Sequence, residues 1–127
     1  MVIHEGVFIF NVYNLKIGNN VTIHPMCYIE AKGGLELGSD ISIAHNVTIL
    51  TTTHNTEDIN VNINKQGISN FPTTILDNVW IGCKATILCG RTINYGTIIG
   101  ANSVVTKDFA QNLIIAGNPA TVIKQRI

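Results

Sequence analysis

A large aliphatic residue recurs every six positions, and this period restricts the fold more than any other feature of the sequence. The period runs in three blocks: Ile17, Ile23 and Ile29, then Leu37, Ile43 and Ile49, then Ile75, Ile81, Ile87, Ile93, Ile99 and Val105. An amphipathic helix needs apolar steps of three and four residues, and a half-buried strand needs alternation by two. A period of six fits neither, so the aliphatic residues belong to short strands separated by corners.

Each hexad also carries the signals of a tight corner. The fourth residue after most aliphatic positions is small or β-branched: Val21, Cys27, Ile41, Val47, Val79, Ala85, Thr97 and Ser103. Gly, Asn and Asp follow the aliphatic residue in pieces such as IGNN, LGSD and IGAN, where positive φ costs them least. Three hexads close one triangular coil of about 18 residues, and stacked coils bury their aliphatic residues on one another.

Residues that exceed the period must loop out of the stacked coils. The step from Ile29 to Leu37 has two extra residues, which predicts a small bulge at Lys32-Gly33-Gly34. The polar segment THNTEDINVNINKQGISNFP predicts a long loop at about 54–72, and long loops in compact repeats usually serve function. The period ends after Val105, which predicts a C-terminal cap at about 108–127. We therefore expect one all-β, parallel β-helix domain over residues 1–127.

The composition narrows the class of partner and the cellular setting. The chain is 46% hydrophobic and 6% aromatic, as expected of an aliphatic core built from strands. Eight basic and eight acidic residues balance, which argues against nucleic acid and for a small-molecule partner. No apolar stretch approaches the roughly 18 residues of a membrane span, and the N-terminus lacks the features of a signal peptide. Cys27, Cys83 and Cys89 lack CxxC spacing, so we expect reduced thiols and a cytoplasmic protein.

Four segments carry a family resemblance: TILTTTHN at 48–55, FPTTILDNVWIG at 71–82, IIGANSVVTKD at 98–108 and AGNPATVIK at 116–124. With them the chain resembles the hexapeptide-repeat acyltransferases, particularly the maltose/galactoside acetyltransferase and saccharide O-acetyltransferase branch, over about residues 15 to 125. The resemblance implies a left-handed β-helix, one of the exceptions to the right-handed crossover preference. It also implies a homotrimer with active sites between adjacent prisms, and acetyl-CoA as co-substrate without a required metal.

The same resemblance implies roles for individual residues. The family's catalytic histidine falls on His54, and the Trp beside its active site falls on Trp80, which we expect to form a wall of the acceptor site. Positions that line the coenzyme A channel fall on Cys83, Ala101, Thr106, Lys107 and Lys124. Cys83 departs from the Ser, Gly or Ala that is common there. The family's Asn near the acceptor has no clear counterpart around residues 24–26, so the acceptor itself is not implied.

These residues predict a direct acetyl transfer. His54 is suited to take the proton of a sugar hydroxyl while that oxygen attacks the thioester, so no acyl-enzyme is required. Backbone N–H groups near the loop and Cys83 are candidate oxyanion donors, and Lys107, Lys124 and Arg126 are candidate phosphate contacts. The group that orients His54 is open between a backbone carbonyl, Glu57 and Asp58.

Other interpretations stay open at this stage. The enzyme can be an amino-sugar N-acyltransferase rather than an O-acetyltransferase of polysaccharide biosynthesis, or the chain can be a non-catalytic β-helix for assembly or binding. His54 can be a polar corner residue, Trp80 an apolar plug, and the lysines solvating charges. The coil of 20 residues between Ile23 and Ile43 aligns His24 with Ala44 rather than with a second histidine, which argues against the zinc site of β-helical carbonic anhydrases.

Overall fold

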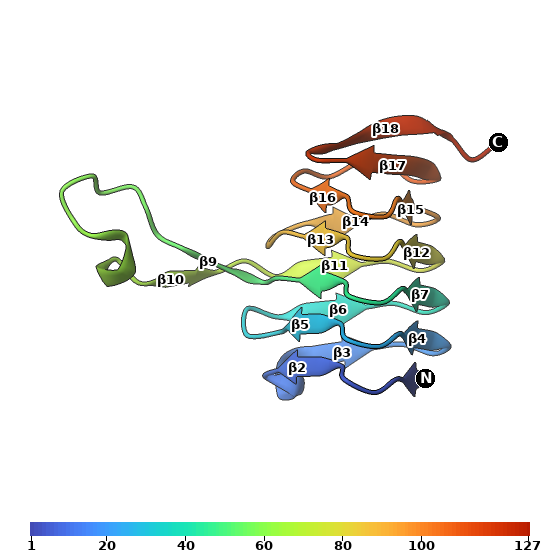
Figure 1. Cartoon of the computed structure of the whole chain (residues 1–127), viewed down its shortest axis with the longest axis horizontal. Coiled ribbons are helices and arrows are strands. Elements are labelled where there is room, and N and C mark those ends of the chain that lie inside the picture. The colour runs from blue at the N-terminus through green and yellow to red at the C-terminus, as the bar shows by residue number, and fades with distance from the viewer.

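A computed structural model describes all residues, 1–127, and has the form of a triangular prism of stacked coils with a long arm (Figure 1). Sheet A contains β1 (Val2–Ile3), β4 (Val21–Ile23), β7 (Ile41–Ile43), β12 (Val79–Ile81), β15 (Ile98–Ile99), β17 (Leu113–Gly117) and β18 (Ala120–Gln125). Sheet B contains β2 (Phe8–Phe10), β5 (Tyr28–Glu30), β8 (Thr48–Ile49), β13 (Thr86–Ile87) and β16 (Val104–Val105). Sheet C contains β3 (Leu15–Ile17), β6 (Leu35–Leu37), β11 (Thr73–Ile75) and β14 (Thr92–Ile93).

The chain passes through sheets A, B and C in turn, and each strand pairs in parallel with the equivalent strand of the next coil. In sheet A, Ile23 aligns with Ile43, Ile43 with Ile81, and Ile81 with Ile99. These positions are the aliphatic residues of the period of six. The predicted fold class, a parallel β-helix with one long protruding loop and a short cap, is therefore confirmed.

The interior of the prism is a continuous aliphatic core. Ile23, Ile43 and Ile81 are fully buried, and the small residues expected at the corners, such as Cys27 and Ala85, are buried beside them. Asparagines take positive φ at several corners, for example 57° at position 46 and 59° at position 102. The aliphatic residues of the repeat are therefore those of the buried core, and the asparagines mark the corners with positive φ, as expected.

The structure adds one coil that the period did not predict. Our first hexad began at Ile17, but β1 and β2 lie below it, with Ile3 aligned to Ile23 and Ile9 aligned to Ile29. The signal was present, since Ile3 and Ile9 are six residues apart, but a two-residue excess before Ile17 breaks the period at once. A short 3-10 turn, η1 (Val12–Asn14), accommodates that excess.

The long insertion forms an arm rather than an irregular loop. β9 (Thr52–His54) and β10 (Ile68–Asn70) pair antiparallel into a ribbon, and a 3-10 turn, η2 (Ile63–Lys65), lies near its tip. At the tip, the Gln66 Nε2 donates to the backbone oxygens of Asp58 and Val61, both at 2.8 Å. The ribbon leaves the prism between β8 of sheet B and β11 of sheet C, on the side away from β4, β7 and β12 of sheet A (Figure 1).

The C-terminal end of the prism is closed by a hairpin. β17 continues sheet A in parallel with β15, and β18 folds back antiparallel on β17. Ala120 and Ile115 of this hairpin are buried, and Phe109 packs against the core from the preceding segment. No helix of the chain has the length and apolar character that crossing a membrane requires.

The buried isoleucine columns predict a large stability cost when one residue of a column is truncated. Ile81 has no exposed surface and lies between Ile43 and Ile99, so Ile81→Ala should lower the free energy of unfolding by about 2–5 kcal/mol. Thr86→Ala on the outer face of sheet B is the control and should change it by less than about 1 kcal/mol. Urea unfolding monitored by circular dichroism measures both, and equal effects would contradict the assigned columns.

Candidate active site

His54 is the last residue of β9, so it lies on the arm near the prism and not at the distant tip. Its side chain is exposed, and its Cα is opposite that of Ile68 in the ribbon. The two acidic candidates for its orientation are engaged elsewhere: Glu57 accepts from the Thr56 N–H at 3.2 Å, and Asp58 accepts from the Asn60 N–H at 3.0 Å. Neither carboxylate is hydrogen-bonded to His54.

Trp80 and two of the predicted donor-channel residues line one hollow of about 420 Å³ at the edge between sheets A and B. Its residues are Ala44, His45, Trp80, Gly82, Cys83, Ile98, Ile99, Gly100 and Ala101. The floor is shallow because Ala44, Gly82 and Gly100 occupy equivalent corners of successive coils. A Cβ at Gly82 would lie 2.6 Å from the Ala101 nitrogen, so glycine permits both the hollow and the close approach of the next coil.

The hollow offers unpaired backbone donors. Neither the Cys83 N–H nor the Ala101 N–H donates to a backbone or side-chain acceptor of the chain. The glycine before each of them is bonded, since the Gly82 N–H donates to the Ile99 carbonyl and the Gly100 N–H to the Ile115 carbonyl. An N–H group without a partner in the chain is available to bind a carbonyl or a developing oxyanion. The Cys83 side chain, which departs from the family pattern, is a free and partly exposed thiol.

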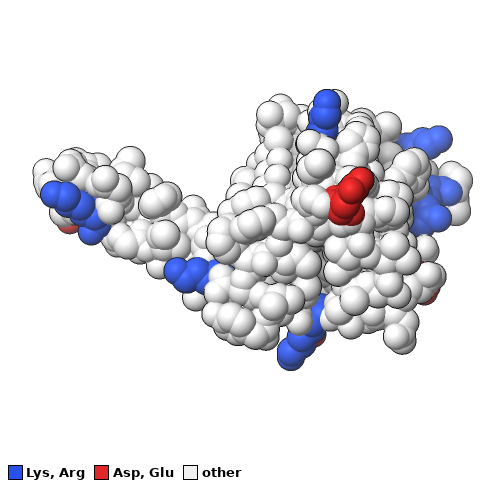
Figure 2. Space-filling model, turned by 60° about the horizontal axis from the view of Figure 1, so that its bottom comes forward, with Lys and Arg blue, Asp and Glu red and all other residues white.

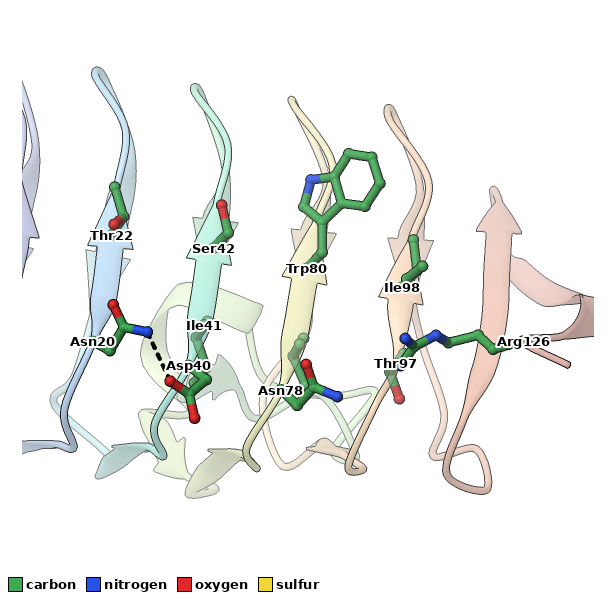
Figure 3. A pocket seen from close by; sticks show the side chains of 11 residues that line it. Asn20, Thr22, Asp40, Ile41, Ser42, Asn78, Trp80, Thr97, Ile98 and Arg126 are labelled. Carbon is green, nitrogen blue, oxygen red and sulfur yellow. Dashed lines mark hydrogen bonds between the residues drawn. The ribbon is translucent and has the colours of Figure 1, made fainter.

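A second hollow of about 380 Å³ lies on the outer face of sheet A, on the other side of Trp80 (Figure 3). It is polar: the Asn20 Nδ2 donates to Asp40 Oδ1 at 2.7 Å, and Thr22 and Ser42 lie on the strands beside them. Arg126 reaches this face from the C-terminal end and donates from Nη1 to the Gly96 carbonyl at 2.8 Å. Trp80 stands upright between Ser42 and Ile98, its neighbours in the sheet.

The remaining predicted donor residues lie toward the C-terminal end. Thr106 and Lys107 follow β16 at the edge between sheets B and C, and the Lys107 Nζ is 5.5 Å from the centre of the Phe109 ring. Lys124 lies on β18 opposite Ile114. All three side chains are exposed. The opposite, N-terminal end of the prism carries few charged side chains, and its Lys and Arg lie toward the margins of the view (Figure 2).

The predicted site residues therefore form two groups within one chain. His54, Thr106 and Lys107 follow strands of sheet B at the edge with sheet C. Trp80, Lys124 and the Cys83 hollow belong to sheet A and its edge with sheet B. Sheet B separates the two groups. The sequence identified the residues but did not separate them into these groups.

Two histidines have neighbours that the sequence did not predict. His45 lines the Cys83 hollow. His24 does align with Ala44, but it also stacks on His4 of the additional coil, with ring centres 4.9 Å apart and planes 10° apart. The alignment of His24 with Ala44 is therefore confirmed, and His4 of the additional coil is a neighbour that this alignment did not include. The stacked rings present their faces to each other, and no group of three metal-binding side chains occurs in the structure.

The chain matches curated acetyltransferases over most of its length. It is 37% identical to the galactoside O-acetyltransferase of Escherichia coli K12 over 113 residues, which are 88% of this chain and 54% of the relative. It is 36% identical to a putative acetyltransferase of Staphylococcus aureus MRSA252 over 115 residues, which are 89% of this chain and 56% of the relative. No family model matches the chain.

Solved structures share the fold. A maltose O-acetyltransferase from Clostridium difficile 630 superposes with a TM-score of 0.83 at 33% identity, over 97% of this chain and 65% of that one. A hexapeptide-repeat acetyltransferase from Vibrio cholerae gives a TM-score of 0.88 at 22% identity, over 99% of this chain and 70% of that one.

The protein belongs to the hexapeptide-repeat acyltransferases, which have a left-handed parallel β-helix. Within that family its relatives are in the galactoside and maltose O-acetyltransferase branch, as the four sequence segments indicated. The chain spans about half the length of the curated relatives that it matches.

The three cysteines should differ in reactivity because their surroundings differ. Cys27 is buried, its Sγ lies 3.0 Å from the Ala44 carbonyl oxygen, and burial raises the pKa of its thiol. Cys83 and Cys89 are partly exposed. A thiol reagent at neutral pH should modify Cys83 and Cys89 in the native protein and Cys27 only after unfolding, since the thiolate is the reactive form. Equal modification rates by mass spectrometry would contradict this assignment.

Proposed function

We propose that the protein transfers an acetyl group from acetyl-CoA to a hydroxyl of a saccharide, with His54 as the general base. One observation carries the proposal: within this family's fold, an exposed histidine occupies the base of the arm while a hollow with free N–H donors lies beside Trp80. Both features serve thioester-to-hydroxyl transfer. The relatives named galactoside and maltose O-acetyltransferase support a saccharide as acceptor.

The active site is completed by a second copy of the chain. His54 and the Trp80 hollow lie on different edges of one prism, with sheet B between them. In a closed ring of copies, each interface joins two different surfaces of the same chain. If sheet C of one copy faces sheet A of the next, the arm edge of the first copy lies beside the hollow of the second.

We take the ring to contain three copies, as the family resemblance implies. Three identical contacts between sheet C of one copy and sheet A of the next then close the ring and leave neither surface free. In this homotrimer, the edge that carries Asn20, Asp40 and Asn78 lies toward the axis. The polar hollow on sheet A then belongs to the subunit contact, and the hollow of Cys83 and Ala101 remains open to the outside.

The reaction follows from these positions. The acceptor hydroxyl lies between His54 and the thioester, and the His54 imidazole takes the hydroxyl proton as the oxygen attacks the carbonyl carbon. The tetrahedral intermediate bears an oxyanion, which the N–H groups of Cys83 and Ala101 stabilise. When the carbon–sulfur bond breaks, the coenzyme A sulfur leaves and receives the proton from the His54 imidazolium, and the acetyl ester of the saccharide is released. No covalent enzyme intermediate forms.

The donor runs parallel to the prism axis, in the groove between two copies. Lys124 of the copy that supplies the hollow and Lys107 of the copy that supplies His54 bind the phosphates of coenzyme A by charge-assisted hydrogen bonds at the C-terminal end. Thr106 lies beside Lys107, and the pantetheine arm runs over Ala101 and Cys83 toward the level of His54. Trp80 forms the wall against which the acceptor ring packs. The reaction as proposed requires no metal.

The first prediction concerns the base. His54→Ala should lower kcat by about 10²–10⁴ because a positioned base contributes that factor, while the affinity for coenzyme A should change by less than about twofold. Lys107→Ala should show the opposite pattern, with weaker coenzyme A binding. Thiol release measures the rate and calorimetric titration measures the affinity. If the wild-type protein does not bind coenzyme A at millimolar concentration, the proposal is wrong.

A second prediction tests the shared site. His54→Ala and Ala101→Trp each remove one half of the site, so each variant alone should be inactive. An equal mixture of the two variants, refolded together, should recover about a quarter of wild-type activity, since one in four of all interfaces then joins an intact arm to an intact hollow. Recovery of no activity from mixed trimers of confirmed composition would mean that both halves act within one chain.

A further inference from the structure

Glu30 makes an unusually complete set of contacts with the base of the arm. It is the last residue of β5, at the edge between sheets B and C. Its Oε1 accepts from the Thr51 hydroxyl at 2.6 Å and the Thr51 N–H at 3.1 Å. Its Oε2 accepts from the Thr52 hydroxyl at 2.7 Å. Both oxygens are therefore bonded to the two residues at which the arm begins, 21 and 22 positions away in sequence.

Thr51 links this carboxylate to both strands of the arm. The Thr51 side chain is fully buried, and its hydroxyl accepts from the Gly33 N–H at 2.8 Å. The Thr51 carbonyl accepts from the Phe71 N–H at 2.8 Å, where the returning strand rejoins the prism. A Cβ at Gly33 would lie 2.2 Å from the Thr51 carbonyl oxygen, so only glycine fits there. The bulge at residues 32–34 is thus shaped to receive the base of the arm.

The contact with Thr52 determines which way His54 faces. Alternate residues of a strand point to the same side, so Thr52 and His54 project from one face of the β9–β10 ribbon. The Thr52 hydroxyl is held on Glu30 of the coil below. The direction of this ribbon face, and with it the side on which His54 projects, is therefore fixed by the carboxylate.

We propose that Glu30 is a positioning residue for the reaction at His54. It does not touch the reacting atoms, and it acts by holding the arm in one orientation against the prism. The inference rests on the proposed function, because it assigns to Glu30 the alignment of the general base with a site on the neighbouring copy. A rigid base of the arm matters there, since a displacement of about 1 Å can cost on the order of 10²-fold in rate.

The carboxylate has a property that an amide cannot reproduce. It offers two acceptor oxygens to three donors, whereas the glutamine side chain offers one acceptor oxygen and an NH₂ group. Hydrogen bonds to an ionised carboxylate are also about twice as strong as neutral ones. Glu30→Gln should therefore preserve the shape of the contact but weaken it, and Glu30→Ala should remove it.

The kinetic test compares these variants with Glu5→Ala, which removes an exposed carboxylate of the first coil. We expect Glu30→Ala to lower kcat by about 10- to 100-fold with the KM for acetyl-CoA changed by less than about threefold, and Glu30→Gln to be intermediate. Glu5→Ala should retain wild-type kcat. A Glu30→Ala protein that is folded and has wild-type kcat would overturn the proposal.

A double-mutant cycle separates positioning from general stability. Thr52→Val should lower kcat in the wild-type background and have little further effect in Glu30→Ala, because both changes break the same contact. Independent losses that multiply would show that Glu30 does not act through Thr52, and would also overturn the proposal.

A measurement on the free protein keeps the test independent of acetyl transfer. The NMR signals of the His54 ring should shift or broaden in Glu30→Ala, and hydrogen exchange at the Thr51 and Phe71 amides should accelerate, with neither change in Glu5→Ala. If acetyl transfer is absent from the wild type, the proposed function fails while these signals still test the contact. Unchanged His54 signals in Glu30→Ala would overturn the positioning role in either case.

Discussion

The stacking of one coil on the next is the interaction on which the rest of the structure depends. Each strand of the prism hydrogen-bonds to its equivalents above and below, and each inward isoleucine packs on the isoleucines of the neighbouring coils. Because stability in such a solenoid is largely a sum of neighbour terms, every coil must keep the same path inside the prism. Variation is confined to outward side chains, to corners and to insertions that leave the prism.

The position of the arm follows from this constraint. An insertion can leave the stack only at a corner, and its two ends must rejoin consecutive strands of the same coil. Here the arm leaves after β8 and returns before β11. The buried Thr51 hydroxyl bonds to Glu30 of the coil below, and the buried Thr73 hydroxyl donates to the Leu50 carbonyl across the gap between the two ends of the arm. The arm is consequently anchored on the rigid part of the molecule although most of its own residues are exposed. A general base near its root can then be both accessible and well oriented.

The same constraint explains why one prism cannot complete the proposed site. The outward positions of a triangular coil diverge, so side chains on different edges point away from each other. His54 and the hollow beside Trp80 belong to different edges, and no change of rotamer can bring them together across sheet B. In the proposed trimer, a neighbouring copy supplies the missing half without any change in the coil.

The sequence by itself determined the repeating part of this protein. A period of six with small corners leaves few alternatives, so the strands, the buried columns, the bulge at residues 32–34 and the protruding segment were all predictable from local pattern. The first coil was missed because the period before Ile17 is interrupted after one step. Motif order identified the family and named His54, Trp80 and Cys83 as candidates, since those signals are local in sequence.

Only the tertiary structure decided how distant residues meet. Glu30 bonds to Thr51 and Thr52 across 21 and 22 positions, and His4 stacks on His24 one coil away. No local pattern encodes such contacts, because they depend on the register of whole coils and on the exact number of extra residues between them. The division of the site between two edges has the same origin: sequence order specifies which residues exist, and the handed path of the coil decides which edge each one occupies.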